Sequence, residues 1–314
     1  MHQTEVQFDA REKPMDKQTT GKSKKKWFGY ILFGILVTLL FLYYRFPSDA
    51  FEDYLQDRVE KMNTQFTLSV DKVAPSMTFG LRFIGARLYY KTNREKPVFE
   101  TEKLLVRPSI LSVFRKEWRF CFNALVYKGV VEGCSSVEKK KKDAPFQTTV
   151  ALKGIPMGAD DSLKDIIGRN LEGTLNGNIT FRGEPKSLMS GTGEVDLRLS
   201  DGRIGLEQPI LNLDGIGFHE VLIKMTLENR RINLTRVALR GTNMNGSLSG
   251  VVILNNDISR SSLNLRGTLE PFAEFIKDLT DSPDTVRLIR QRMNRGKITF
   301  AIRGTLAEPS FRFL

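Results

Sequence analysis

The sequence predicts a mainly β protein, in which a single N-terminal transmembrane helix precedes a long curved antiparallel sheet with a few amphipathic helices. Residues 27–44 contain neither charge nor proline. From Gln65 onward, apolar and polar residues alternate with a period of two, as in strands with one buried face. Glycines beside Thr or Ser interrupt these segments, and such glycines usually mark bends, bulges or turns of a sheet.

Residues 27–46 are predicted to cross a membrane, because about 20 apolar residues at 1.5 Å per residue span a bilayer core. The basic and aromatic residues that mark the ends of this segment are Lys24, Lys25, Lys26, Trp27, Tyr43, Tyr44 and Arg45. The positive-inside rule places residues 1–26, a polar tail predicted to be disordered, in the cytoplasm. A cleaved signal peptide and a buried soluble helix are the alternatives, but the small residues of a cleavage site are missing.

Residues 47–64 are predicted to form an amphipathic helix, and Asp49 with Glu52 suits its first turn as a capping pair. The apolar residues recur at helical spacing, at Phe51, Tyr54, Leu55, Val59 and Met62. This apolar stripe would cover the open end of the sheet that follows. A helix lying flat on the membrane is the alternative, which the mixed charge of the polar face disfavours.

Residues 65–314 are predicted to form one β-rich domain of roughly fifteen short strands. The alternating segments are 66–70, 81–90, 99–108, 118–127, 129–133, 146–154, 171–185, 190–204, 238–255, 263–271 and 298–311. Residues 137–145 read as a polar loop with a solvated lysine run, or alternatively an anion-binding spot. Helices are predicted at 162–170 and, around a break at Pro283, at 272–295. A sheet with one apolar face needs a second sheet, closure into a barrel or an apolar ligand to cover that face.

The two cysteines, Cys121 and Cys134, flank one predicted hairpin. If Lys128 and Gly129 form its two-residue turn, Cys134 lies opposite Asn123, and the cysteines are diagonal neighbours. A disulfide then requires a bulge that shifts the register. Two buried free thiols are the alternative.

The composition argues against catalysis and against nucleic-acid binding. The net charge of +12 is spread along a chain set beyond a membrane, where anionic headgroups or acidic proteins are the better partners. The two histidines, His2 and His219, are far apart, and the common metal, nucleophile and phosphate-loop motifs are missing. We therefore expect neither an enzyme nor a bound metal or cofactor.

Four segments carry a resemblance to a known family: LYYRFPSDAFEDYL at the end of the anchor, then LSVDKVAPSMTFGLRF, VRPSILSVF and YKGVVEG. Together they resemble the GspN family of type II secretion system proteins, in the form found in delta-proteobacteria. The ending ITFAIRGTLAEPSFRF resembles the C-terminal segments of AsmA-like proteins, which are membrane-anchored periplasmic β-proteins. The resemblance implies an anchor in the bacterial inner membrane, a periplasmic AsmA-like domain and an accessory role in secretion, and it implies no catalytic residues.

Two functions are open on these grounds. The first is a non-catalytic scaffold that docks onto other type II secretion components through exposed strand edges. The second is a lipid-handling module, in which the curved sheet encloses an apolar groove that holds the acyl chains of a phospholipid. In that case Leu197 and Leu265 are expected to point into the groove.

Overall fold

The computed structural model describes residues 21–62, 66–76, 80–90, 97, 99–139, 144–158, 170–185, 187–210, 213–278, 291 and 293–314. The chain forms two compact units, Met1–Phe46 and Pro47–Leu314. Within the residues described, no helix satisfies the length and apolarity expected of a membrane span. Residues 1–20 of the predicted tail, which runs to residue 26, lie outside the described residues.

The helices agree in part with the sequence pattern. They are α1 Gly21–Tyr44, α2 Ser48–Met62, the 3₁₀ helices η1 Ile110–Phe114 and η2 Ile258–Arg260, and α4 Ala273–Asp278. Helix α1 begins at Gly21, so its first residues belong to the segment predicted as a disordered tail. The helix predicted from the apolar spacing of residues 47–64 is confirmed as α2, with Asp49 in its first turn. Residues 162–169 of the predicted helix 162–170 and the Pro283 break lie outside the described residues.

The second unit is built on one antiparallel sheet of 15 strands, in which nearly every strand pairs with the next along the chain. The strands are β1 Phe66–Ser69, β2 Lys72–Ser76, β3 Gly80–Tyr90, β4 Phe99–Pro108, β5 Glu117–Val126, β6 Gly129–Glu138, β7 Phe146–Met157, β8 Gly173–Glu184, β9 Ser187–Ile210, β10 Leu213–Glu228, β11 Arg231–Gly241, β12 Met244–Ile253, β13 Ser262–Pro271, β14 Ile298–Thr305 and β15 Pro309–Phe313. Both β1 and β2 pair with β3, and the remaining strands form a continuous meander to β15. The prediction of a mainly β protein with a long antiparallel sheet is therefore confirmed.

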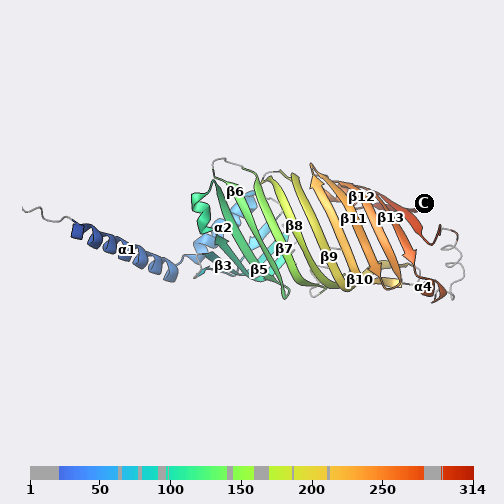
Figure 1. Ribbon diagram of the computed structural model, residues 1–314, viewed down its shortest axis with the longest axis horizontal. Coiled ribbons are helices and arrows are strands. Elements are labelled where there is room, and N and C mark those ends of the chain that lie inside the picture. The colour runs from blue at the N-terminus through green and yellow to red at the C-terminus, as the bar shows by residue number, and fades with distance from the viewer. Residues whose placement is uncertain are drawn as a thin grey trace, which may run out of the picture. The chain divides into compact units, whose positions relative to one another are not determined.

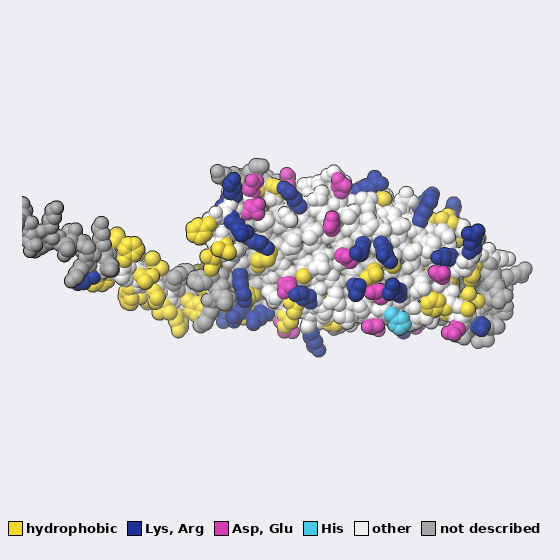
Figure 2. Space-filling model, viewed as in Figure 1, with side chains coloured by type: hydrophobic (Ala, Val, Ile, Leu, Met, Phe, Trp, Pro, Cys, Tyr) yellow, Lys and Arg dark blue, Asp and Glu magenta, His cyan; other side chains and the backbone are white. Residues whose placement is uncertain are grey.

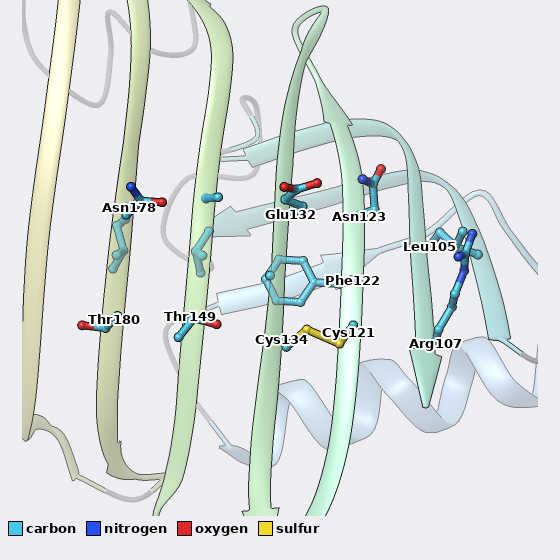
Figure 3. Close-up of a pocket in the computed structure, with 14 residues that line it drawn as sticks. Leu105, Arg107, Cys121, Phe122, Asn123, Glu132, Cys134, Thr149, Asn178 and Thr180 are labelled. Atoms are coloured by element: carbon cyan, nitrogen blue, oxygen red, sulfur yellow. A yellow bond between two sulfur atoms is a disulfide. The ribbon is translucent and has the colours of Figure 1, made fainter. Parts of the chain in front are cut away.

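The sheet bends at its N-terminal end. Figures 1 and 3 both show the first strands, drawn in pale blue and cyan, passing behind β5 to β7. Helix α2 packs against β1 and β2, the place that its apolar stripe predicts. Arg87 of β3 joins two parts of this end, since its guanidinium donates to Glu100 of β4 and to Asp71 before β2, each at 2.8 Å. These acceptors raise the pKa of Arg87 above its usual value.

Several predicted strand boundaries were wrong. The loop expected from residue 137 begins later, because β6 continues to Glu138. Residues 238–255 are not one strand but the end of β11, a turn and β12. Strands β2 and β10 were not predicted, and the strands are not uniformly short, since β9 has 24 residues.

The hairpin between β5 and β6 turns one residue earlier than predicted. Tyr127 and Lys128 both adopt left-handed backbone conformations, with φ of 48° and 71°, which suits a tight two-residue hairpin turn. Gly129 is instead the first residue of β6, where a Cβ atom would lie 2.6 Å from the Cα of Ile155. The register predicted from a turn at Lys128 and Gly129 was therefore wrong. Cys121 lies directly opposite Cys134.

Candidate apolar groove

Two rows of apolar residues cross the sheet on one face, each with one residue from every strand between β2 and β15. The first row is Val73, Phe83, Leu104, Ala124, Val131, Leu152, Gly177, Leu197, Ile223, Val237, Leu248, Gly267, Phe300 and Phe313. The second row is Pro75, Leu81, Val106, Phe122, Gly133, Val150, Ile179, Val195, Met225, Leu234, Gly250, Leu265, Ile302 and Phe311. Neither row contains a polar or charged side chain. We call the surface that these two rows form the apolar face.

Irregularities in the strand pairing keep the apolar face free of polar side chains. In β11 the register shifts next to Thr235, so Leu234 rather than Thr235 pairs with Met225. In β7 the register shifts between Leu152 and Ile155, and both of these residues lie on the apolar face. A β-bulge inserts one residue and so reverses the phase of the alternation that follows it. The shifts thus correct the places where the strict period of two would turn a polar residue inward.

Glycines within the rows leave space for large neighbours on the adjacent strand. A Cβ atom on Gly177 would lie 2.7 Å from a methyl group of Leu197, and one on Gly267 would lie 2.4 Å from the ring of Phe300. The prediction that such glycines mark bends or turns is too narrow, because these two lie in mid-strand under a neighbouring side chain. They allow that side chain to lie flat across the sheet.

The apolar face is closed at its ends and only half covered in its middle. At the N-terminal end Val73 and Phe83 are buried, and at the C-terminal end Phe275 of α4 packs with Met244 and Ile298. Another buried cluster lies on β9 and β10 and comprises Leu199, Phe218 and Val221. The middle of the second row has no fully buried side chain; Val150, Ile179, Val195, Met225 and Leu234 are all half-buried.

The two residues predicted to point into a groove both lie on the apolar face, with different surroundings. Leu197 belongs to the first row and is half-buried, so it can line a groove. Leu265 belongs to the second row, between Gly250 and Ile302, and only 7% of it is exposed, so it is part of the packed core. Sequence reasoning missed Ile179, Val195 and Met225, since the cross-strand register that aligns them cannot be read from one strand alone.

The opposite face of the sheet is polar and charged. Lys224 pairs with Asp196 at 2.8 Å, and Glu220 lies between Arg198 and Arg240 at 3.2 and 3.1 Å. Figure 2 shows one side of the sheet on which cations and carboxylates are interspersed. Such exposed pairs contribute little stability, but they keep this face in water. His219 is also exposed there, 4.0 Å from Asp201, as expected for a surface residue.

A disulfide between Cys121 and Cys134 joins β5 and β6, with an S–S distance of 2.07 Å. It lies in a shallow depression of about 850 Å³ on the polar face, shown in Figure 3, where Cys121 and Asn123 of β5 lie between Arg107 of β4 and Glu132 of β6. Within the described residues no three His, Cys, Asp or Glu side chains form a metal-binding group. The depression is open and offers no group positioned for chemistry, so the apolar face is the stronger candidate site.

The predicted anchor residues all lie on or next to α1. The helix contains Lys24, Lys25, Lys26, Trp27, Tyr43 and Tyr44, and Arg45 follows it as the first turn residue. The described apolar side chains of α1 are mostly exposed, among them Leu32, Phe33, Leu36 and Phe41. The side chains of Lys24 and Lys25 lie outside the described part.

Comparisons with known proteins found no match among protein-family models, curated proteins or solved structures.

Proposed function

We propose that this protein is a membrane-anchored lipid-handling module, in which the apolar face of the sheet holds the acyl chains of phospholipids. The observation that carries this proposal is the continuity of the two apolar rows through 14 strands, with a middle that the described residues leave half covered. At about 4.8 Å per strand, each row extends roughly 60 Å. Acyl chains suit such a surface, because each buried methylene group contributes about 0.8 kcal/mol.

The anchor proposal rests on the sequence of α1. The helix contains the uncharged stretch 27–44, preceded by Lys24, Lys25 and Lys26, so the positive-inside rule would leave the N-terminus in the cytoplasm. Only residues 45–47 separate α1 from α2, so an α1 that spans a bilayer would start the second unit at its surface. The resemblance to AsmA-like proteins supports a periplasmic location for this unit, facing the bacterial inner membrane.

Matched charge substitutions on the two faces of β8 test the proposal. Ile179 lies in the second row, and its neighbour Thr180 lies on the polar face and is exposed. We expect Ile179→Asp in residues 47–314 to abolish binding of a fluorescent long-chain phospholipid, because a carboxylate in the groove is costly to desolvate. Thr180→Asp should leave binding unchanged. Leu197→Asp should repeat the effect of Ile179→Asp.

Circular dichroism and thermal unfolding serve as the folding control for these variants. Equal lipid binding by folded Ile179→Asp and Thr180→Asp would argue against the groove. Loss of binding in both would mean that the lipid associates with the surface rather than with the apolar face.

An accessory role in a type II secretion system is a second candidate. Within the described residues the sheet is an open path that begins at β1 and ends at β15, which pairs with β14. An open strand edge can accept a further strand from a partner protein. The resemblance of the first half of the sheet to GspN proteins favours secretion components as that partner. If cross-linked capture of the tagged chain from its native cells recovers none of them, this candidate fails.

A further inference from the structure

The 3₁₀ helix η1, between β4 and β5, has three apolar side chains in solvent and its serine buried. Ile110, Leu111 and Phe114 are 62%, 68% and 88% exposed, whereas Ser112 is only 2% exposed. Globular proteins normally bury such residues in the opposite way. We call Ile110, Leu111 and Phe114 the apolar tip.

Polar contacts hold the apolar tip in this orientation. The Ser112 hydroxyl donates to the carbonyl of Ser109, and the ammonium group of Lys139 donates to the Ser112 carbonyl at 2.7 Å. The same ammonium group lies 4.4 Å from the ring centroid of Trp118. The Ser109 amide donates to the Arg119 carbonyl at 2.8 Å, which fixes the base of the turn to β5. These contacts fix η1 so that the apolar tip projects into solvent.

The exposed apolar surface continues from the tip to the edge of the apolar face. Trp118 and Phe120 follow in β5 and are 44% and 42% exposed. Phe120 pairs with Pro108 of β4 and lies two residues before Phe122, so it shares the face of the second row. Figure 1 draws η1 as a teal coil at the N-terminal end of the sheet, and Figure 2 shows hydrophobic side chains there with cations nearby.

Exposed cations accompany the tip. Arg115 and Lys116 follow it directly, and Arg119 lies three residues further on, with Glu117 as the single acid between them. An apolar projection beside basic side chains is complementary to a bilayer surface, where apolar groups enter the acyl boundary and cations meet anionic headgroups. A protein partner would instead require an apolar pocket surrounded by acidic residues.

We propose that η1 inserts its apolar tip into the interface of an anionic phospholipid bilayer, and that this contact places the end of the apolar face at the membrane. The second part rests on the proposed function, because it treats the apolar face as the acceptor of acyl chains. The first part does not, since insertion of the tip requires only the turn and its cations.

The test compares two labelled positions in the full chain. Leu111→Cys carries an environment-sensitive fluorophore at the tip, and Ile258→Cys carries it on η2, another 3₁₀ helix with an exposed isoleucine near a cation, Arg260. The native cysteines are joined to each other and are not labelled in the absence of reductant. Both proteins are reconstituted into vesicles of phosphatidylcholine, with and without phosphatidylglycerol, so α1 contributes equally to both.

We expect a blue shift of the emission, and quenching by spin-labelled lipid, at position 111 in vesicles that contain phosphatidylglycerol and not at position 258. Arg115→Gln with Lys116→Gln should lower the inserted population roughly fivefold per cation removed. Phe114→Ser should also lower it, and folding should be unaffected because Phe114 is 88% exposed.

The proposal fails if position 111 responds no more than position 258, or if its response is the same in phosphatidylcholine alone. A blue shift without quenching by lipid would mean that a protein surface covers the tip, which also overturns it. Lipid extracted from residues 47–314 reports separately on the apolar face, so failure of the docking proposal and failure of the groove proposal give different results.

Discussion

Removal of the disulfide between Cys121 and Cys134 should destabilise the sheet by an amount that the chain separation sets. The two cysteines are 13 residues apart, and closing a loop of that size costs the unfolded chain about 3 kcal/mol of conformational entropy. The variant Cys121→Ala, Cys134→Ala of residues 47–314 should lose up to that amount. Trp118, in the same strand β5, is the only tryptophan of this part of the chain and reports locally by fluorescence.

Urea unfolding, followed by Trp118 emission, measures the change in the free energy of unfolding. The unchanged protein in the presence of reductant is the matched control, and its midpoint should approach that of the double variant. Alkylation without reductant should modify neither cysteine. The reasoning is refuted if both thiols alkylate under these conditions, or if the variant unfolds at the same urea concentration as the oxidised protein.

Three further predictions concern single residues. Phe300→Ala removes a buried ring of the first row and should cost about 3–5 kcal/mol in urea unfolding, whereas a loss below about 1 kcal/mol would mean that this end is not packed. Gly177→Ala should lower the melting temperature, because its Cβ would lie 2.4 Å from the Asp196 carbonyl oxygen; an unchanged value would contradict the close approach. Hydrogen bonds from the side chain and backbone of Ser259 lower the pKa of Asp257 below its usual 3.8. These hydrogen bonds therefore stabilise η2 fully above pH 3.8, and this stabilisation is lost as the pH falls through the lowered pKa. The protection of the Ser259 amide, relative to an unstructured amide at the same pH, should therefore fall in acid, and a protection profile matching that of Asp257→Asn would contradict this.

The period of two was sufficient to predict the fold class and most of the strands. Alternation along β4, β5, β8 and β13 matches the observed elements closely, because each of these strands has one apolar face and one polar face. Strand β10 was not predicted, because apolar and polar residues do not alternate strictly in its sequence FHEVLIKM (218–225). A register shift between Phe218 and Glu220 interrupts the alternation. A single strand does not reveal such a shift.

The disulfide shows how one residue of register changes a prediction. Glycine is the usual residue for a left-handed turn position, which favours a turn that contains Gly129. In the structure Tyr127 and Lys128 form the turn instead, and Gly129 lies in β6, where its backbone closely approaches Ile155 of β7. That requirement comes from a neighbouring strand, which local turn preferences do not include.

The candidate site was predictable in kind but not in extent. The sequence predicts that Leu197 and Leu265 point into a groove, and the register places both residues in the rows of the apolar face. The continuity of the rows depends on pairings between fourteen strands and on shifts such as the one at Thr235. The exposed tip at η1 could have been found from the apolar residues between Pro108 and Arg115, but the burial of Ser112 that orients it is a tertiary property.

The most direct test of the central claim is mass spectrometry of organic extracts from residues 47–314, purified from membranes without added lipid. Our account predicts phospholipid in near-stoichiometric amount, and its loss in folded Ile179→Asp. A folded domain that carries no lipid would mean that its own side chains fill the apolar face, which would contradict the groove and leave the secretion scaffold as the remaining proposal.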